Sequence, residues 1–182
     1  RPGLPAAPLF EHEARYAGKS RREKMDLVRE QINGYGARHY LVTTLDDIAW
    51  MLNLRGNDIQ FNPLFIGYLL LNEDEAVLFI DDRKVPPTLA EKLAADSVQL
   101  RPYAAIATFL EELPGDEPVL IDPLSISVRL FDTLQDKTVT RGHNIPRQLK
   151  AIKTDSEVAH IRRAMVKDGV ALVRLFRWLE AT

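Results

Sequence analysis

Short apolar segments that alternate with amphipathic ones constrain the fold of this chain more than any other feature. Residues 64–71 and 76–80 (LFIGYLLL and AVLFI) flank the polar tetrapeptide NEDE, a pattern that predicts a β-hairpin. Helical patterns over 88–96, 104–113 and 124–134 are each followed by a short strand pattern. Helices that alternate with strands, together with one hairpin, predict an α/β domain with a mixed β-sheet flanked by helices.

Two further helices are predicted before the hairpin. Ser20 and Glu23 form a capping-box pattern, which opens the first of them. Residues 40–42 (YLV) follow as a short strand. Thr44 is expected to cap the second helix, and Gly56 is expected to end it.

The domain organisation follows from changes of pattern along the chain. Residues 1–19 are rich in proline and glycine without a period, so we expect a linker there. Residues 20–153 carry the α/β pattern. Residues 154–182 have a helical period to the last residue, with a broad apolar side that needs burial in something larger. We therefore expect the chain to be part of a longer protein.

Composition argues against several classes of protein. The chain has no cysteine, which excludes disulfides, thiolate metal sites and cysteine nucleophiles. Its net charge of −2 provides no electrostatic attraction for nucleic acid. No apolar run approaches the roughly 20 residues of a membrane helix. We expect a protein of the cytoplasm that binds neither nucleic acid nor membrane.

Three carboxylates suggest a rival function. Asp81 and Asp82 follow one predicted strand and Asp122 follows another. Acids at strand ends can bind a divalent cation and support phosphoryl transfer in an RNase H-like fold. The alternative, favoured by the net charge, is that Asp81 and Asp82 begin a turn and Asp122 caps a helix. The four histidines are isolated from one another and form no metal-binding motif.

The segment 55–63 (RGNDIQFNP) is polar although apolar elements flank it on both sides. Local roles are available, because Gly56 can end a helix and Arg55 can pair with Asp58. Loops on rigid scaffolds nevertheless carry function disproportionately often. We therefore expect Arg55, Asp58 and Asn62 to lie at the edge of a cleft or at an interface.

Residues 46–71 (DDIAWMLNLRGNDIQFNPLFIGYLLL) resemble the second domain of three-domain aminopeptidases P, the Xaa-Pro aminopeptidases of the creatinase and prolidase superfamily. The resemblance continues through LRPYAAI, VLIDPLSIS and LKAIKTDSEVAHIRRAMVKDGVALVRLFRWLE. It implies a creatinase/prolidase N-terminal domain with an RNase H-like motif. The last helix would then be the first of a truncated catalytic domain with the pita-bread fold.

For the parent protein the resemblance implies a hydrolase that removes the N-terminal residue from peptides with proline second. The catalytic domain of the family holds two divalent metal ions, typically manganese, and this chain matches none of their ligands. We expect the chain to have no catalytic, cofactor-binding or metal-binding residue. It would instead shape the substrate cleft and contact domain I, the catalytic domain and a second subunit of a homodimer. The alternative is a free-standing recognition or assembly module without peptidase activity.

Overall fold

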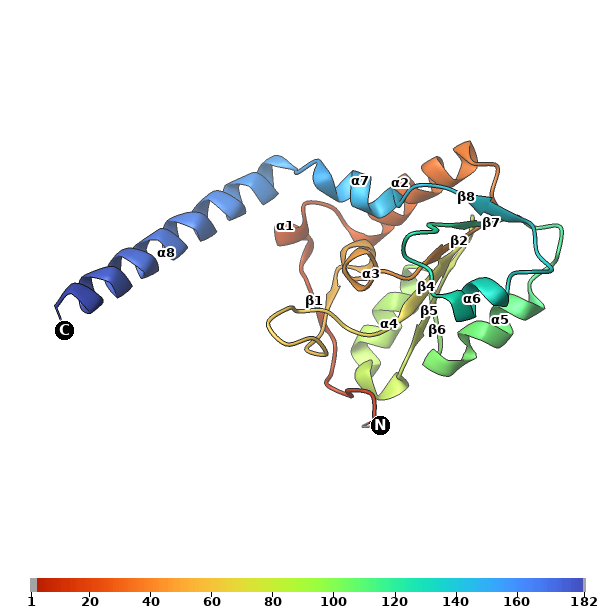
Figure 1. The fold of residues 1–182 in the computed structure, drawn as a ribbon, viewed down its shortest axis with the longest axis horizontal. Coiled ribbons are helices and arrows are strands. Elements are labelled where there is room, and N and C mark those ends of the chain that lie inside the picture. Colours follow the sequence, from red (N-terminus) through yellow and green to blue (C-terminus); the bar gives the residue numbers. More distant parts are fainter. Residues whose placement is uncertain (1–2, 182) are drawn as a thin grey trace.

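The computed structural model describes residues 3–181, in which helices cover both faces of a six-stranded mixed sheet (Figure 1). In spatial order the strands are β6 (Val98–Pro102), β5 (Ala76–Ile80), β4 (Tyr68–Leu71), β2 (His39–Val42), β7 (Val119–Ile121) and β8 (Val139–Arg141). Strand β4 is antiparallel to both of its neighbours, and the other three pairs in the sheet are parallel. The mixed α/β sheet predicted from the alternating pattern is confirmed.

The central hairpin is also confirmed. Tyr68 pairs with Phe79 and Leu71 with Ala76 in an antiparallel register. In the turn, the side-chain oxygen of Asn72 accepts hydrogen bonds from the backbone N–H groups of Asp74 at 3.0 Å and Glu75 at 2.8 Å. The apolar residues 64–67 lie before the strand, in the loop that leads to it.

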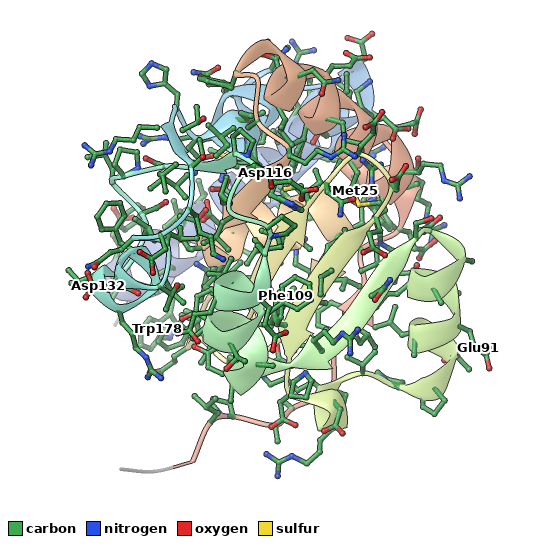
Figure 2. All side chains as sticks on the ribbon, turned by 90° about the vertical axis from the view of Figure 1, so that its right-hand side faces the viewer. Met25, Glu91, Phe109, Asp116, Asp132 and Trp178 are labelled. Atoms are coloured by element: carbon green, nitrogen blue, oxygen red, sulfur yellow. The ribbon has the colours of Figure 1, made fainter. Side chains whose placement is uncertain are left out.

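Alternation along the strands produces two apolar layers, because successive side chains of a strand point to opposite faces of the sheet. Tyr40 and Val42 of β2 belong to one layer, and Leu41 between them belongs to the other. The first layer is covered by α2 (Arg21–Gly34), α3 (Leu45–Leu52), α4 (Pro87–Ala95) and α7 (Ile145–Ala151), and the second by α5 (Ile106–Glu112) and α6 (Val128–Asp132). Figure 2 shows Glu91 of α4 pointing outward and Phe109 of α5 against the sheet.

Helices α2 and α3 begin directly after the two residues predicted to cap them, Ser20 and Thr44. The predicted capping box of Ser20 is present at the start of α2. Thr44 precedes α3 as predicted, but its hydroxyl donates to the carboxylate of Asp47 instead of capping the backbone. Helix α3 ends at Leu52, because Asn53 adopts the left-handed conformation with φ 51° and serves as the C-cap. The prediction that Gly56 ends this helix is therefore wrong.

Several short elements were not predicted by the sequence pattern. Strand β1 (Phe10–Glu11) pairs antiparallel with β3 (Leu54–Arg55), and α1 (Ala14–Ala17) follows it. Leu9, just before β1, is buried in the first apolar layer. The segment before Ser20 is thus packed onto the domain through the buried side chains of Leu9 and Ala17 and the pairing of β1 with β3.

The last helix, α8 (Asp155–Glu180), projects from the body (Figure 1). It begins with a capping box of Thr154 and Glu157, in agreement with the predicted start. None of its 26 residues is buried. Its exposed large apolar side chains are those of Ile161, Met165, Val166, Val170, Leu172, Val173, Leu175, Phe176, Trp178 and Leu179.

Helix α8 is attached to the body at a joint with α1. Gly18, at φ 74°, lies so close to Thr154 that an added Cβ would be 2.3 Å from the threonine Oγ1. The rings of Tyr16 and His160 meet beside it, with centroids 5.2 Å apart. Glycine at position 18 is therefore required by both its backbone conformation and the available space.

None of the helices in the described part of the chain has both the length and the hydropathy that a bilayer span requires.

Candidate functional site

The three residues predicted to serve a cleft or an interface lie on or beside the loop between β3 and β4, residues 56–67. In Figure 1 this loop leaves the body on the same side as α8. Arg55 is the last residue of β3, Asp58 lies near the base of the loop, and Asn62 lies near its tip. The structure therefore brings them to one region, although their environments differ.

Arg55 is held at the C-terminal end of α3. Its Nη1 donates to the carbonyl oxygens of Ala49 at 2.9 Å and Leu54 at 2.8 Å. A positive charge is favoured there, because the carbonyl groups of a helix concentrate negative potential at its C-terminus. Burial lowers the pKa of the Arg55 guanidinium from its ordinary value. Both hydrogen bonds use a single nitrogen, so the other donors of this planar group are not committed to them.

Asp58 has a different role, because its side chain is fully buried. Its Oδ2 accepts hydrogen bonds from the Lys84 ammonium and from the backbone N–H of Ile66, the latter at 2.7 Å. The exposed fractions of the Asp58 and Lys84 side chains are 0% and 1%. The predicted alternative of an Arg55–Asp58 pair is wrong, because Lys84, 26 residues further along the chain, takes the carboxylate. This ion pair fastens the loop to the 3-10 helix Asp82–Lys84.

Backbone hydrogen bonds hold the two sides of the loop together. The N–H of Gly56 donates to the Pro63 carbonyl at 3.2 Å, and the N–H of Asp58 donates to the Leu64 carbonyl at 3.0 Å. A Cβ at Gly56 would lie 2.8 Å from that of Phe65, so the close approach of the two sides requires glycine. The loop is thus held in shape by its own backbone hydrogen bonds together with the contacts of Asp58.

The tip of the loop is exposed. Asn62 is exposed, and its backbone N–H donates to the Ile59 carbonyl at 3.1 Å. Phe61 beside it has a positive φ of 62° and is 98% exposed. Of the predicted residues, Asn62 is accessible, Arg55 is half-buried, and the side chain of Asp58 is inaccessible to a partner of the loop.

Two of the three carboxylates of the rival nuclease hypothesis, those of Asp81 and Asp122, bind neighbouring groups of the chain. Asp81 caps the 3-10 helix through the N–H of Arg83 at 3.1 Å and also pairs with that guanidinium. The Arg83 hydrogen bonds hold the pKa of Asp81 low, at about 2. Asp122 accepts from the N–H of Leu124 at 3.0 Å and so stabilises a turn. Among residues 3–181, no group of three or more histidine, aspartate and glutamate side chains could hold a metal ion.

A buried lysine was missed by the sequence reasoning. Lys24 of α2 is only 2% exposed, and its Nζ donates to the side-chain oxygen of Asn53 at 2.7 Å and to the Trp50 carbonyl at 3.2 Å. The ammonium also lies 4.6 Å from the centre of the Trp50 ring, a cation–π contact. Burial lowers the pKa of Lys24 to about 8. A signal was available, because Lys24 and the buried Val28 are four residues apart on one face of a helix.

Comparison with known families decides what this domain is. The family described as Creatinase/Prolidase N-terminal domain matches residues 1–157. The chain belongs to the creatinase/prolidase N-terminal domain family. A probable Xaa-Pro aminopeptidase P of Coprinopsis cinerea is 36% identical over 99% of this chain, which corresponds to 31% of that relative. An Xaa-Pro aminopeptidase 1 of Dictyostelium discoideum is 32% identical over 98% of the chain and 28% of its own length.

Solved structures agree with this assignment. The X-prolyl aminopeptidase of Caenorhabditis elegans, described as a cytosolic enzyme with a di-nuclear active site, superposes with a TM-score of 0.91 at 25% identity. The match covers 99% of this creatinase/prolidase N-terminal domain chain and 30% of the worm enzyme. A Bacillus anthracis Xaa-Pro dipeptidase shares the fold at a TM-score of 0.57 and 16% identity. Almost the whole chain is matched, and it spans about three-tenths of the length of these aminopeptidases.

Proposed function

We propose that this chain is the non-catalytic part of an Xaa-Pro aminopeptidase, a hydrolase that removes the N-terminal residue from peptides with proline in second place. The observation that carries the proposal is the relation of lengths. The relatives of Coprinopsis cinerea and Dictyostelium discoideum match 99% and 98% of the chain, yet the chain accounts for only 31% and 28% of their lengths. The remaining length of such a parent is available for a catalytic domain and a further N-terminal domain.

The domain division proposed above fits this assignment. Residues 1–19 would lead in from domain I, residues 20–153 would form domain II, and residues 154–182 would be the first helix of the catalytic domain. The C. elegans enzyme has a di-nuclear active site. Residues 3–181 contain no cluster of histidine, aspartate and glutamate side chains that fits such a centre, and Asp81 and Asp122 bind neighbouring groups of the chain. Two divalent ions, which we expect to be manganese, would be bound by other parts of the parent.

Arg55, Asp58 and Asn62 would serve this function from the loop between β3 and β4. Arg55 keeps uncommitted guanidinium donors, which suit a carboxylate or a peptide carbonyl. Asn62 is exposed at the tip, whereas Asp58 acts from beneath by holding the loop to Lys84. The loop would border the substrate cleft or a contact with another domain or subunit. We further propose that the parent is a cytoplasmic homodimer.

The experiment compares the full-length parent with this chain on an Xaa-Pro peptide, with manganese added to both. The parent should release the N-terminal amino acid in a reaction that a chelator abolishes, and the chain should release none. Chelator-sensitive cleavage by the purified chain would contradict the assignment. A full-length protein that binds peptides without cleaving them would instead support a recognition or assembly module.

A further inference from the structure

The side chain of Phe61 stands out among the apolar residues of the folded body. It is 98% exposed, whereas Phe65, four residues later on the same loop, is completely buried. Phenylalanine is among the residues most often buried in folded proteins. The whole ring is therefore available to a partner at the tip of the loop.

The backbone at Phe61 is strained as well as exposed. Its φ of 62° lies in the left-handed region, which residues other than glycine rarely adopt. Such strain persists only where the surrounding structure determines it, and it concentrates at functional sites. Here the bonds from Gly56 to Pro63 and from Asp58 to Leu64 hold the loop in shape. The ring is thus presented in one backbone conformation before any partner arrives, which reduces the entropic cost of binding.

The surroundings of the ring define the chemistry of that partner. Ile59 and Pro63 flank it as exposed apolar residues, and Gln60 and Asn62 add exposed amide groups. Asp58 is the only charged residue of the loop, and it is buried against Lys84. An aromatic anchor with an uncharged polar rim fits a concave apolar hollow edged by hydrogen-bonding groups.

The location of the loop indicates which molecule carries the hollow. The loop and α8 leave the body on the same side in Figure 1. Helix α8 has no buried residue, and its apolar side chains are exposed along its length. The aminopeptidase relatives contain about 70% of their length outside the matched region. One further domain of the same polypeptide, seated against α8, would therefore also face the loop.

We propose that Phe61 is the anchor with which this loop docks into an apolar hollow on the catalytic domain of the same polypeptide. The inference rests on the proposed function and extends it. It assigns a docking role to a residue that neither the loop's hydrogen bonds nor the core explains. Arg55, whose free donors point to a polar contact, would lie at the base of the same interface.

The test is hydrogen exchange measured by mass spectrometry on the full-length parent and on this chain. In the chain alone, the amides of residues 60–62 should exchange rapidly. In the parent they should exchange at least tenfold more slowly, and Phe61→Ala should abolish that protection. Leu124→Ala is the matched control, because Leu124 is 92% exposed on the turn after β7 and should leave the loop's protection unchanged.

A second variant separates docking from folding. Phe61→Gly relieves the positive φ, so it should raise the melting temperature of the isolated chain while it removes the protection in the parent. Equal exchange of the loop in parent and chain would overturn the docking role. So would protection in the chain that grows with its concentration, because it would identify a second copy as the partner. Peptidase activity of the same full-length sample tests the proposed function separately, since an active parent with an unprotected loop contradicts only this inference.

Discussion

The ion pair between Lys84 and Asp58 should be the strongest single side-chain determinant of the loop's attachment. Both side chains are withdrawn from solvent, and the Asp58 carboxylate otherwise accepts only the N–H of Ile66. Lys84→Met keeps the length of the side chain but leaves a buried carboxylate without its counter-charge. Removing one partner of a buried pair costs about 3–5 kcal/mol. For a chain of this size, that loss corresponds to a fall in melting temperature of roughly 6–20 °C.

The neighbouring residue supplies the control. Arg83 lies beside Lys84 in the same 3-10 helix and also pairs with an aspartate, but its side chain is 67% exposed. Exposed pairs of this kind contribute little to stability, so Arg83→Met should leave the melting temperature almost unchanged. Thermal unfolding followed by circular dichroism measures both variants under identical conditions. The double variant Asp58→Asn/Lys84→Met should recover more than half of the loss, because asparagine keeps an acceptor for Ile66 without a buried charge. If Lys84→Met is no less stable than Arg83→Met, the ion pair does not hold the loop.

Three further changes test other parts of the structure. Arg55→Lys in the full-length parent should lower the specificity constant about tenfold or more, because a charge-assisted contact contributes roughly 1.5–3 kcal/mol. The melting temperature should change little. If the kinetics are unchanged and the protein is less stable, Arg55 only stabilises the end of α3. Gly18→Ala should destabilise the chain and speed amide exchange in the first turn of α8, because the new Cβ collides with Thr154. Gly34→Ala is the control and should be neutral or stabilising, because nothing lies within 4 Å of the added Cβ. The pKa of Lys24 is lowered by burial from 10.5 to about 8, so between these values the unfolded chain binds more protons and unfolding free energy should rise with pH. Urea unfolding at pH 8 and pH 10 should show wild type gaining stability relative to Lys24→Met, and a constant difference would mean that Lys24 titrates normally.

The secondary structure with a strong local signal could be predicted from the sequence. Apolar runs on both sides of NEDE specify the hairpin, the capping box at Ser20 marks the start of α2, and the helical period from residue 154 indicates α8. The end of α3 could not be predicted in the same way. The sequence does not indicate that Asn53 leaves the helix by adopting the left-handed conformation. It also does not indicate that the next residues, β3, pair with β1, because Phe10 and Arg55 are far apart in the chain.

The predicted helix over 124–134 shows a second limit of local reasoning. Only Val128–Asp132 is helical, because Asp122 first binds the N–H of Leu124 in a turn that leaves that leucine exposed. Side chains that bind the backbone locally compete with helix formation, and the apolar period does not reveal which of the two prevails.

In the candidate site, too, local features could be predicted and contacts between distant residues could not. That 55–63 forms an exposed loop beside a rigid helix could be expected from its polarity, and Arg55 and Asn62 lie there. The partner of Asp58 could not be predicted, since Lys84 follows a different strand and no local pattern connects the two. The neighbours of the two phenylalanines agree with their environments, because Gln60 and Asn62 flank the exposed Phe61 and Leu64 and Ile66 flank the buried Phe65.

The joint between α1 and α8 has a mechanical consequence. A helix of 26 residues is about 39 Å long, so a rotation of 10° at its base displaces its far end by about 7 Å. The contact of Gly18 with Thr154 and the rings of Tyr16 and His160 therefore act as the fulcrum of a long lever. A change of a few tenths of an ångström at these side chains is amplified along α8. The direction of α8, and with it the position of any domain that packs on its apolar side chains, therefore depends on the contact of its first turns with α1.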